Sequence, residues 1–240
     1  MNLLLLAPGE INADGRARVD PDRYPARAGL WPPAIGRELR VGLQDGEIGS
    51  ARVIARDASG IELACELHTP PPPPLPLRLV LALPRPKMLR RVLRTVAELG
   101  IKELWLVNAS RVEKSYWQSP LLASGAIRSY LIAGLEQAID TVMPRVELRH
   151  RLRPFAEDEL PSIVAGTRAL VAHPGATSTL GPLAERPLTL LVGPEGGFTD
   201  FEIALFAAAG CRAASLGSRV LRVETALPTL VGTLFAAGPQ

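Results

Sequence analysis

The feature that most constrains this chain is a proline run, TPPPPPLP, at residues 69–76. Prolines at this density exclude a helix or a central strand, because each proline lacks a backbone N–H and fixes its φ angle. Such a run forms a short extended spacer of the polyproline type. We therefore predict a domain at residues 1–69, a linker at residues 70–76 and a second domain at residues 77–240.

The residues before the prolines have the pattern of a small β domain. Short pieces that alternate polar and apolar residues occur at 38–43, 50–55 and 60–64, and turn-forming residues such as Asp and Gly separate them. Period-two alternation between turns is typical of antiparallel strands. The opening MNLLLLAPGE lacks the basic flank and long apolar core of a signal peptide, so we interpret it as a first strand.

After the prolines, the pattern changes to strands that alternate with helices. Pro86 suits the first turn of a helix that ends at Gly100, and a long helix is predicted at about 118–140. Near-continuous apolar strands between helices are typical of a parallel sheet that is covered on both faces. We predict an α/β fold for this part, with strands at residues 77–83, 103–108, 145–148, 169–173, 188–192 and 213–216.

Composition excludes several classes of protein. No stretch approaches the roughly 20 apolar residues of a membrane span, so we expect no membrane segment. Cys65 and Cys211 lie far apart, without a CxxC motif, which predicts buried thiols in a reducing cytoplasm and no metal site. The net charge of +3 permits a polyanionic partner without identifying one.

Positive charge is concentrated on the helix that follows the first strand of the second domain. Lys87, Arg90, Arg91 and Arg94 share one helix face by their spacing. The segment from Arg78 to Arg94 holds six basic residues and no acidic one. A solvated helix face and a contact surface for a phosphate backbone both remain open.

The stretch LLVGPEGGFTDFEI, residues 190–203, joins a predicted strand to a predicted helix. The segment Thr199–Glu202 has the pattern of a capping box, which explains the start of the helix. It does not explain Gly193, Gly196 and Gly197. The phosphate-loop and GxGxxG patterns are both absent, so a plain loop and a ligand site remain open.

A second glycine loop follows the next predicted strand, in the sequence LGSRVLRVETA at residues 216–226. Arg219 and Arg222 lie beside Gly217, where they can face an anionic substrate or form a surface ion-pair cluster. Loops at the ends of consecutive strands can form the walls of one pocket. The two loops together are therefore more specific than either one alone.

Together these loops resemble the end of the 16S ribosomal RNA uridine-N3 methyltransferases, a family in the SPOUT class of knotted methyltransferases. Supporting pieces are the segments 97–101, 110–111, 136–137 and 172–174, and the resemblance covers residue 78 onward. It implies a PUA-like β domain, a parallel-sheet SPOUT domain with a C-terminal trefoil knot, a homodimer and S-adenosylmethionine as the cofactor. The cofactor-binding residues that it implies are Leu191, Val192, Gly193, Gly196, Leu216, Gly217, Val220 and Leu221.

The resemblance also implies the chemistry, which is transfer of a methyl group from a sulfonium to a uracil nitrogen without a metal. Arg219 and Arg222 are the candidates for orienting the nucleotide and stabilising developing negative charge. Glu195 or Glu224 can assist removal of the N3 proton, and each has an alternative role in its loop or helix start. We expect Arg111 to bind ribosomal RNA together with the basic residues at 87–94.

The chain departs from the family pattern at Thr95 and Asp140, where Lys and Arg are usual, and at residues 28–33 in the first domain. Two alternatives to the leading prediction therefore stay open. One is a non-catalytic RNA-binding or ribosome-assembly protein that retains the fold. The other is a SPOUT methyltransferase that acts on another RNA.

Overall fold

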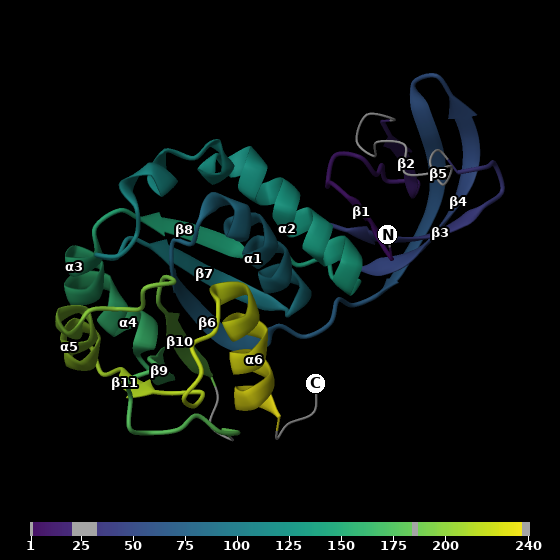
Figure 1. Ribbon diagram of the computed structural model, residues 1–240. Helices are drawn as coiled ribbons and strands as arrows, with labels where there is room; N and C mark the ends of the chain where they lie inside the picture. Colours follow the sequence, from purple (N-terminus) through teal and green to yellow (C-terminus); the bar gives the residue numbers. More distant parts are fainter. Residues whose placement is uncertain (1, 21–32, 184–186, 237–240) are drawn as a thin grey trace. The chain divides into compact units, whose positions relative to one another are not determined.

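The computed structural model describes residues 2–20, 33–183 and 187–236 (Figure 1). Contacts within the chain divide it into two units. Unit 1 consists of Met1–Pro73 and Ile132–Met143, and unit 2 consists of Pro74–Leu131 and Pro144–Gln240. The division between Pro73 and Pro74 lies inside the proline run.

Unit 1 is built on a five-stranded sheet in the order β1-β3-β4-β5-β2. The predicted strands at 38–43, 50–55 and 60–64 are present, and the opening apolar run forms the first strand, as predicted. Aliphatic side chains from all five strands form the core between them. The strands are β1 (Leu4–Leu6), β2 (Arg16–Val19), β3 (Glu38–Leu43), β4 (Ile48–Asp57) and β5 (Gly60–Thr69).

The expected purely antiparallel pattern is wrong at one edge of this sheet. Strand β1 pairs with β3 in parallel, with Leu4 opposite Val41. Short turns force β3, β4 and β5 into antiparallel pairs, whereas the long connection from β1 to β3 allows a parallel return. The sheet is therefore mixed. The departure at residues 28–33 lies outside the described residues, except for Pro33.

The segment Ile132–Met143 belongs to unit 1 through backbone hydrogen bonds. The amide of Leu3 donates to the carbonyl of Glu136 at 3.0 Å, and the amide of Asp45 donates to the carbonyl of Thr141 at 2.9 Å. Within this segment, Asp140 is only 3% exposed, and its carboxylate accepts from the amide of Val142 at 2.9 Å. The Asp140 carboxylate therefore stabilises the turn that follows the long helix ending at Ala138.

Unit 2 contains a six-stranded sheet in the order β11-β9-β10-β6-β7-β8, in which every pair is parallel. All five residues of β10 are buried, as predicted for a strand covered on both faces. The predicted parallel sheet is confirmed. Its strands are β6 (Leu75–Ala82), β7 (Ile101–Val107), β8 (Arg145–Arg149), β9 (Arg168–Ala172), β10 (Leu188–Val192) and β11 (Arg212–Ala214).

The helices that follow the proline run begin and end largely where the sequence predicts. Helix α1 has Pro86 at its start, and Gly100 follows its end with a φ of +72°. Helix α6 packs beside α1 (Figure 1). The α-helices are α1 (Pro86–Glu98), α2 (Ser124–Ala138), α3 (Leu152–Pro154), α4 (Leu160–Val164), α5 (Asp200–Ala208) and α6 (Val223–Phe235), and a π-helix, η4, spans Phe155–Glu159.

The long helix predicted at about 118–140 begins later than expected, at Ser124. Two 3₁₀ turns, η2 (Lys114–Gln118) and η3 (Pro120–Leu122), precede it. Pro120 disfavours the helical conformation of the residue before it, and Ser119 is extended, with a ψ of 132°. The Ser119 hydroxyl instead accepts from the amide of Leu121 at 3.3 Å and starts η3.

Because the six strands are parallel, all of their carboxyl ends lie at one edge of the sheet. The registers of the pairs align the ends of β9 and β10 at Ala172 and Val192, and the ends of β7 and β8 at Val107 and Arg149. The loops that leave this edge carry both glycine motifs. The expected C-terminal trefoil knot stays a prediction.

Three further predictions concern membrane-spanning helices, metal sites and the two cysteines. Within the described residues, no helix has the length and apolar character needed to cross a membrane. The same residues hold no group of three or more His, Cys, Asp or Glu side chains that could bind a metal ion. Cys211 is buried and Cys65 is half-buried, and burial raises the pKa of the Cys211 thiol to about 12.

Candidate functional site

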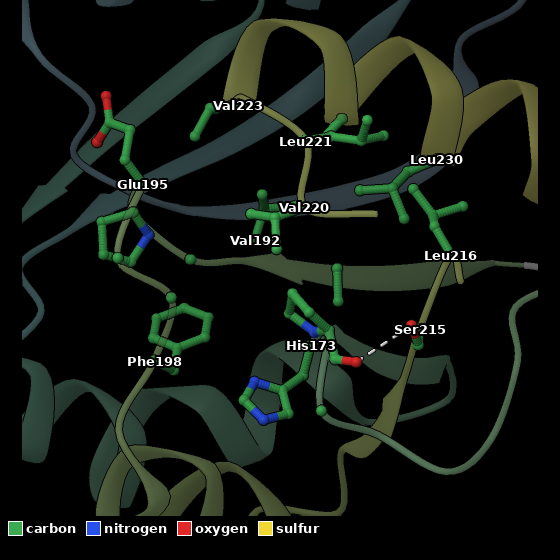
Figure 2. A pocket seen from close by; sticks show the side chains of 18 of the residues that line it. His173, Val192, Glu195, Phe198, Ser215, Leu216, Val220, Leu221, Val223 and Leu230 are labelled. Atoms are coloured by element: carbon green, nitrogen blue, oxygen red, sulfur yellow. Dashed lines mark hydrogen bonds between the residues drawn. The ribbon is translucent and has the colours of Figure 1, made fainter. Parts of the chain in front are cut away.

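A pocket of about 340 Å³ lies where β9, β10 and β11 end at the carboxyl edge of the sheet (Figure 2). Its walls are the two glycine loops predicted from the sequence, and the start of α6 closes one side. The sequence-predicted residues that line it are Arg111, Val192, Gly193, Glu195, Gly196, Leu216, Gly217, Arg219, Val220 and Leu221. Leu191 and Arg222 are not in the lining.

The first glycine loop approaches other backbone and side-chain atoms closely. A Cβ atom on Gly193 would lie 3.2 Å from both the ring and the amide nitrogen of Phe198. Gly197 has a φ of +72°, which favours glycine. The ring of Phe198 packs edge-on against Phe206, with their centroids 4.8 Å apart. The glycines therefore allow a tight loop over an aromatic base.

The predicted capping box at the start of α5 is present. The amide of Glu202 donates to the Thr199 hydroxyl at 3.3 Å, and the Glu202 carboxylate accepts from the amide of Thr199 at 2.7 Å. The second oxygen of this carboxylate accepts from the amide of Ser110 at 2.7 Å, in the loop after β7. Glu202 is 1% exposed. One buried carboxylate thus joins two strand-end loops, which the capping pattern alone does not predict.

The second glycine loop is held by Ser215, a residue that the sequence reasoning missed. Its hydroxyl accepts from the amide of Gly217 at 3.0 Å and lies 3.0 Å from the carbonyl oxygen of the same residue. Its amide donates to the carbonyl of Ser178 at 2.8 Å, in the loop after β9. Gly217 has a φ of +125°. A serine that directly follows a strand and stands two residues before a glycine is the signal that could have identified it.

Two of the candidate catalytic residues line the pocket, and two lie outside its lining. Arg219 is exposed and lines the pocket, whereas Arg222 is the N-cap residue of α6. Glu195 lines the pocket and forms an ion pair with Arg85, in which Nε and Oε1 are 3.5 Å apart. Glu224 lies in the first turn of α6, outside the lining.

Tyr116 is a further ionisable group near this ion pair. Partial burial raises the pKa of its phenol, and the hydrogen bond to Glu113 at 2.9 Å raises it further. The phenol therefore stays protonated at neutral pH. Tyr116 is excluded as a proton acceptor under those conditions.

Arg111 lines the pocket, although the sequence predicts that it binds RNA together with the basic residues of α1. Its guanidinium donates to the carbonyl of Gly196. A Cβ atom on Gly196 would lie 3.0 Å from the Arg111 Cδ, so the aliphatic part of the arginine packs on the glycine. Lys87, Arg90, Arg91 and Arg94 are exposed on α1 and do not line the pocket.

His173 also lines the pocket and was noted in the sequence only as part of Ala172-His173-Pro174. It directly follows β9, and its backbone amide donates to the carbonyl of Ala214 at 3.0 Å. The Nδ1 atom is buried and has no hydrogen-bond partner among the described residues. A buried polar atom without a partner is costly, so this atom is a candidate contact for a ligand.

Residues 71–234 match the model of a protein family described as an RNA methyltransferase domain. The chain belongs to this family. This RNA methyltransferase is 35% identical over 198 residues to the ribosomal RNA small subunit methyltransferase E of Treponema pallidum, which covers 80% of this chain and 74% of the relative.

Two solved structures share the fold of this RNA methyltransferase. One is a ribosomal RNA small subunit methyltransferase E from Neisseria gonorrhoeae bound to S-adenosylmethionine, with a TM-score of 0.76 and 21% identity, covering 97% of this chain and 96% of that one. The other is a methyltransferase from Legionella pneumophila in complex with the same cofactor. Its TM-score is 0.75 and its identity 22%, covering 96% of this chain and 97% of that one. The predicted arrangement of a β domain followed by a SPOUT domain is confirmed.

The substitution Glu202→Gln tests the carboxylate that joins the two loops. One oxygen becomes an NH₂ group, which cannot accept from a backbone amide, so a buried N–H loses its partner. We expect a loss of about 2 kcal/mol in the free energy of unfolding, measured by urea denaturation. The control is Asp200→Asn, at an exposed position in the same helix turn. Equal stability of the two variants would contradict the role given to Glu202.

Proposed function

We propose that this chain is an S-adenosylmethionine-dependent methyltransferase that acts on uridine N3 of 16S ribosomal RNA. The observation that carries the proposal is the pocket at the ends of three parallel strands, formed by the two loops that resemble this family. The relative from Treponema pallidum is named as a small-subunit ribosomal RNA methyltransferase, and the two fold neighbours were solved with S-adenosylmethionine.

The pocket fits the cofactor in size and character. Its volume of about 340 Å³ lies in the range of small-molecule sites. Aliphatic side chains form much of the lining, and the buried Nδ1 of His173 offers a polar contact. The glycines keep space open that a side chain would fill. The residues proposed to hold the cofactor are Val192, Gly193, Gly196, Leu216, Gly217, Val220 and Leu221, with Leu191 behind them in β10.

When bound, S-adenosylmethionine supplies a methyl group whose bond to sulfur breaks, with the electron pair left on sulfur, as a bond from uracil N3 to the methyl carbon forms. The residues of this chain must then align the uracil with the pocket and assist loss of the N3 proton. Arg219 borders the pocket and is exposed toward an incoming nucleotide. We assign it, with Arg222, to orienting the uracil and stabilising negative charge on its oxygens.

Glu195 remains a candidate proton acceptor, although its ion pair with Arg85 gives it a structural role in the glycine loop. We therefore place the positioning role of Glu195 ahead of proton transfer, and water is an alternative acceptor.

The exposed basic residues of α1 are proposed to contact the phosphates of the ribosomal RNA. Lys87, Arg90 and Arg91 form no ion pair among the described residues, and Arg94 lies over the ring of Tyr130 at 5.4 Å. The buried side of the helix holds aliphatic residues only. Charge on the outer face is thus available to a polyanion.

Binding of S-adenosylmethionine is the first test. We expect titration calorimetry to give a dissociation constant in the micromolar range, and S-adenosylhomocysteine to compete. Gly217→Ala forces a side chain into a φ region that it rarely adopts, so the affinity should fall about tenfold. Gly181→Ala is the matched control, because no atom lies near its added Cβ and its φ is not positive. Absence of binding heat in the unmodified protein would sink the proposal.

Transfer of a tritiated methyl group to undermethylated small-subunit RNA tests the catalytic residues. We expect Arg219→Ala and Arg222→Ala to lower kcat/KM about a hundredfold, because each removes a donor to the developing charge. Glu195→Gln should lower it far less, and the exposed Arg212→Ala serves as the control. An arginine variant with full turnover would lose its assigned role. Nucleoside mass spectrometry of the product identifies the methylated atom and base.

A homodimer is the proposed assembly, as the family resemblance implies. Val220 lines the pocket and is 73% exposed, which leaves an apolar side chain for a second copy to cover. Light scattering should give twice the mass of 25.7 kDa. Substitution of Val220 by Lys should shift the population toward monomer. A monomeric unmodified protein would contradict the assembly.

A further inference from the structure

A second group of aromatic and polar side chains lies at the carboxyl edge of the sheet, outside the pocket. Asn108 directly follows β7, and His150 directly follows β8. The ring of Trp117, from η2, lies against the ring of His150, with centroids 4.2 Å apart and planes inclined by 45°. We call Trp117 and His150 the aromatic pair. The cofactor pocket does not use either residue.

Asn108 bonds to the indole of Trp117 and to the backbone of His150. The indole Nε1 of Trp117 donates to the Asn108 Oδ1 at 2.9 Å, and the Asn108 Nδ2 donates to the carbonyl of His150 at 3.2 Å. The backbone amide of Asn108 also donates to the carbonyl of Arg149 at 2.8 Å, which continues the β7–β8 pairing. The indole ring is therefore held before any ligand arrives, which lowers the entropy cost of binding.

The aromatic pair is accessible from solvent and has uncompensated positive charge beside it. His150 is exposed and Trp117 is half-buried. The next residue, Arg151, is exposed and has no ion-pair partner among the described residues. Its neighbours differ, because Arg149 pairs with Glu147 and Glu159, and Arg153 pairs with Glu157. The only uncompensated arginine of this described segment, 149–153, thus adjoins the exposed ring.

The aromatic pair lies on the same edge of the sheet as the pocket. Strands β7 and β8 lie two and three places from β10 in the sheet. At the usual strand spacing, the pair lies roughly 10–15 Å from the end of β10 along the same edge. A short single-stranded segment spans such a distance. A nucleotide that flanks the uridine aligned with the pocket can therefore reach the aromatic pair.

We propose that Trp117 and His150 form a second nucleotide subsite, on which a base of single-stranded RNA that flanks the methylated nucleotide stacks, with Arg151 at its phosphate. Stacking on aromatic side chains together with a nearby cation is the usual mode of single-strand recognition, and it tolerates different bases. The proposal rests on the proposed function, because it takes the uridine aligned with the cofactor pocket as its reference point.

Fluorescence anisotropy with a labelled single-stranded RNA octamer, measured at several salt concentrations, tests this subsite in the full-length protein. We expect Trp117→Leu to weaken binding about tenfold without changing the slope of log affinity against log salt, because stacking releases no counterions. Arg151→Ala should reduce the slope by about 0.7, the value for one phosphate contact on a single strand. His150→Ala removes the exposed ring and leaves Trp117 in the chain. It should also weaken binding without changing the slope of log affinity against log salt.

The matched control is Trp105→Leu, the same change at a half-buried position within β7. It should bind RNA as the unmodified protein does. If Trp117→Leu and His150→Ala both bind like the unmodified protein, the aromatic pair only covers the sheet edge and the proposal is overturned. RNA binding that depends on the pair in a protein without affinity for S-adenosylmethionine supports the subsite and contradicts the proposed function instead.

Discussion

The candidate site depends on the parallel pairing of the six strands of unit 2. In a parallel sheet, each strand needs a long connection, and every carboxyl end meets the same edge. Loops that are far apart in the sequence therefore become neighbours there. Gly193 follows β10, Ser215 follows β11 and His173 follows β9, and these three residues border one pocket. The chemistry of the site comes from loops, whereas its geometry comes from the strand register.

The two glycine loops require glycine for different reasons. The first uses close approach, because a side chain at Gly193 would collide with Phe198. The second uses backbone conformation, because the added Cβ at Gly217 meets no atom but its φ of +125° excludes most residues. A ligand between them is thus contacted mainly by backbone and by aliphatic side chains. Such a wall recognises shape, and the few polar atoms, including the buried nitrogen of His173, provide orientation.

Local chemistry made much of this structure predictable. Pro86 and Gly100 bound α1, the capping box starts α5, and the apolar run at 188–192 forms β10 with the predicted bounds. Each of these features depends on residues close together in the sequence. The glycine loops were also recognisable as neighbours, because consecutive strands in a parallel sheet end at one edge.

Contacts between distant residues were not predictable in the same way. Nothing near Glu195 indicates its ion pair with Arg85, and nothing near Arg111 indicates that it packs on Gly196. The parallel return of β1 and the pairing of Trp117 with His150 likewise depend on where long connections place their ends. The elements and the loops therefore follow from local sequence, whereas side-chain partners across loops depend on the three-dimensional fold.

The buried carboxylate of Glu202 has a consequence for how ligands influence one another. It accepts from Thr199, in the loop that forms the pocket, and from Ser110, in the loop that leads toward η2. A displacement of one loop that moved this carboxylate would alter its hydrogen bond to the other loop. Any coupling carried in this way between a ligand at the pocket and a ligand beside η2 would be reciprocal, so each would change the affinity of the other by the same factor.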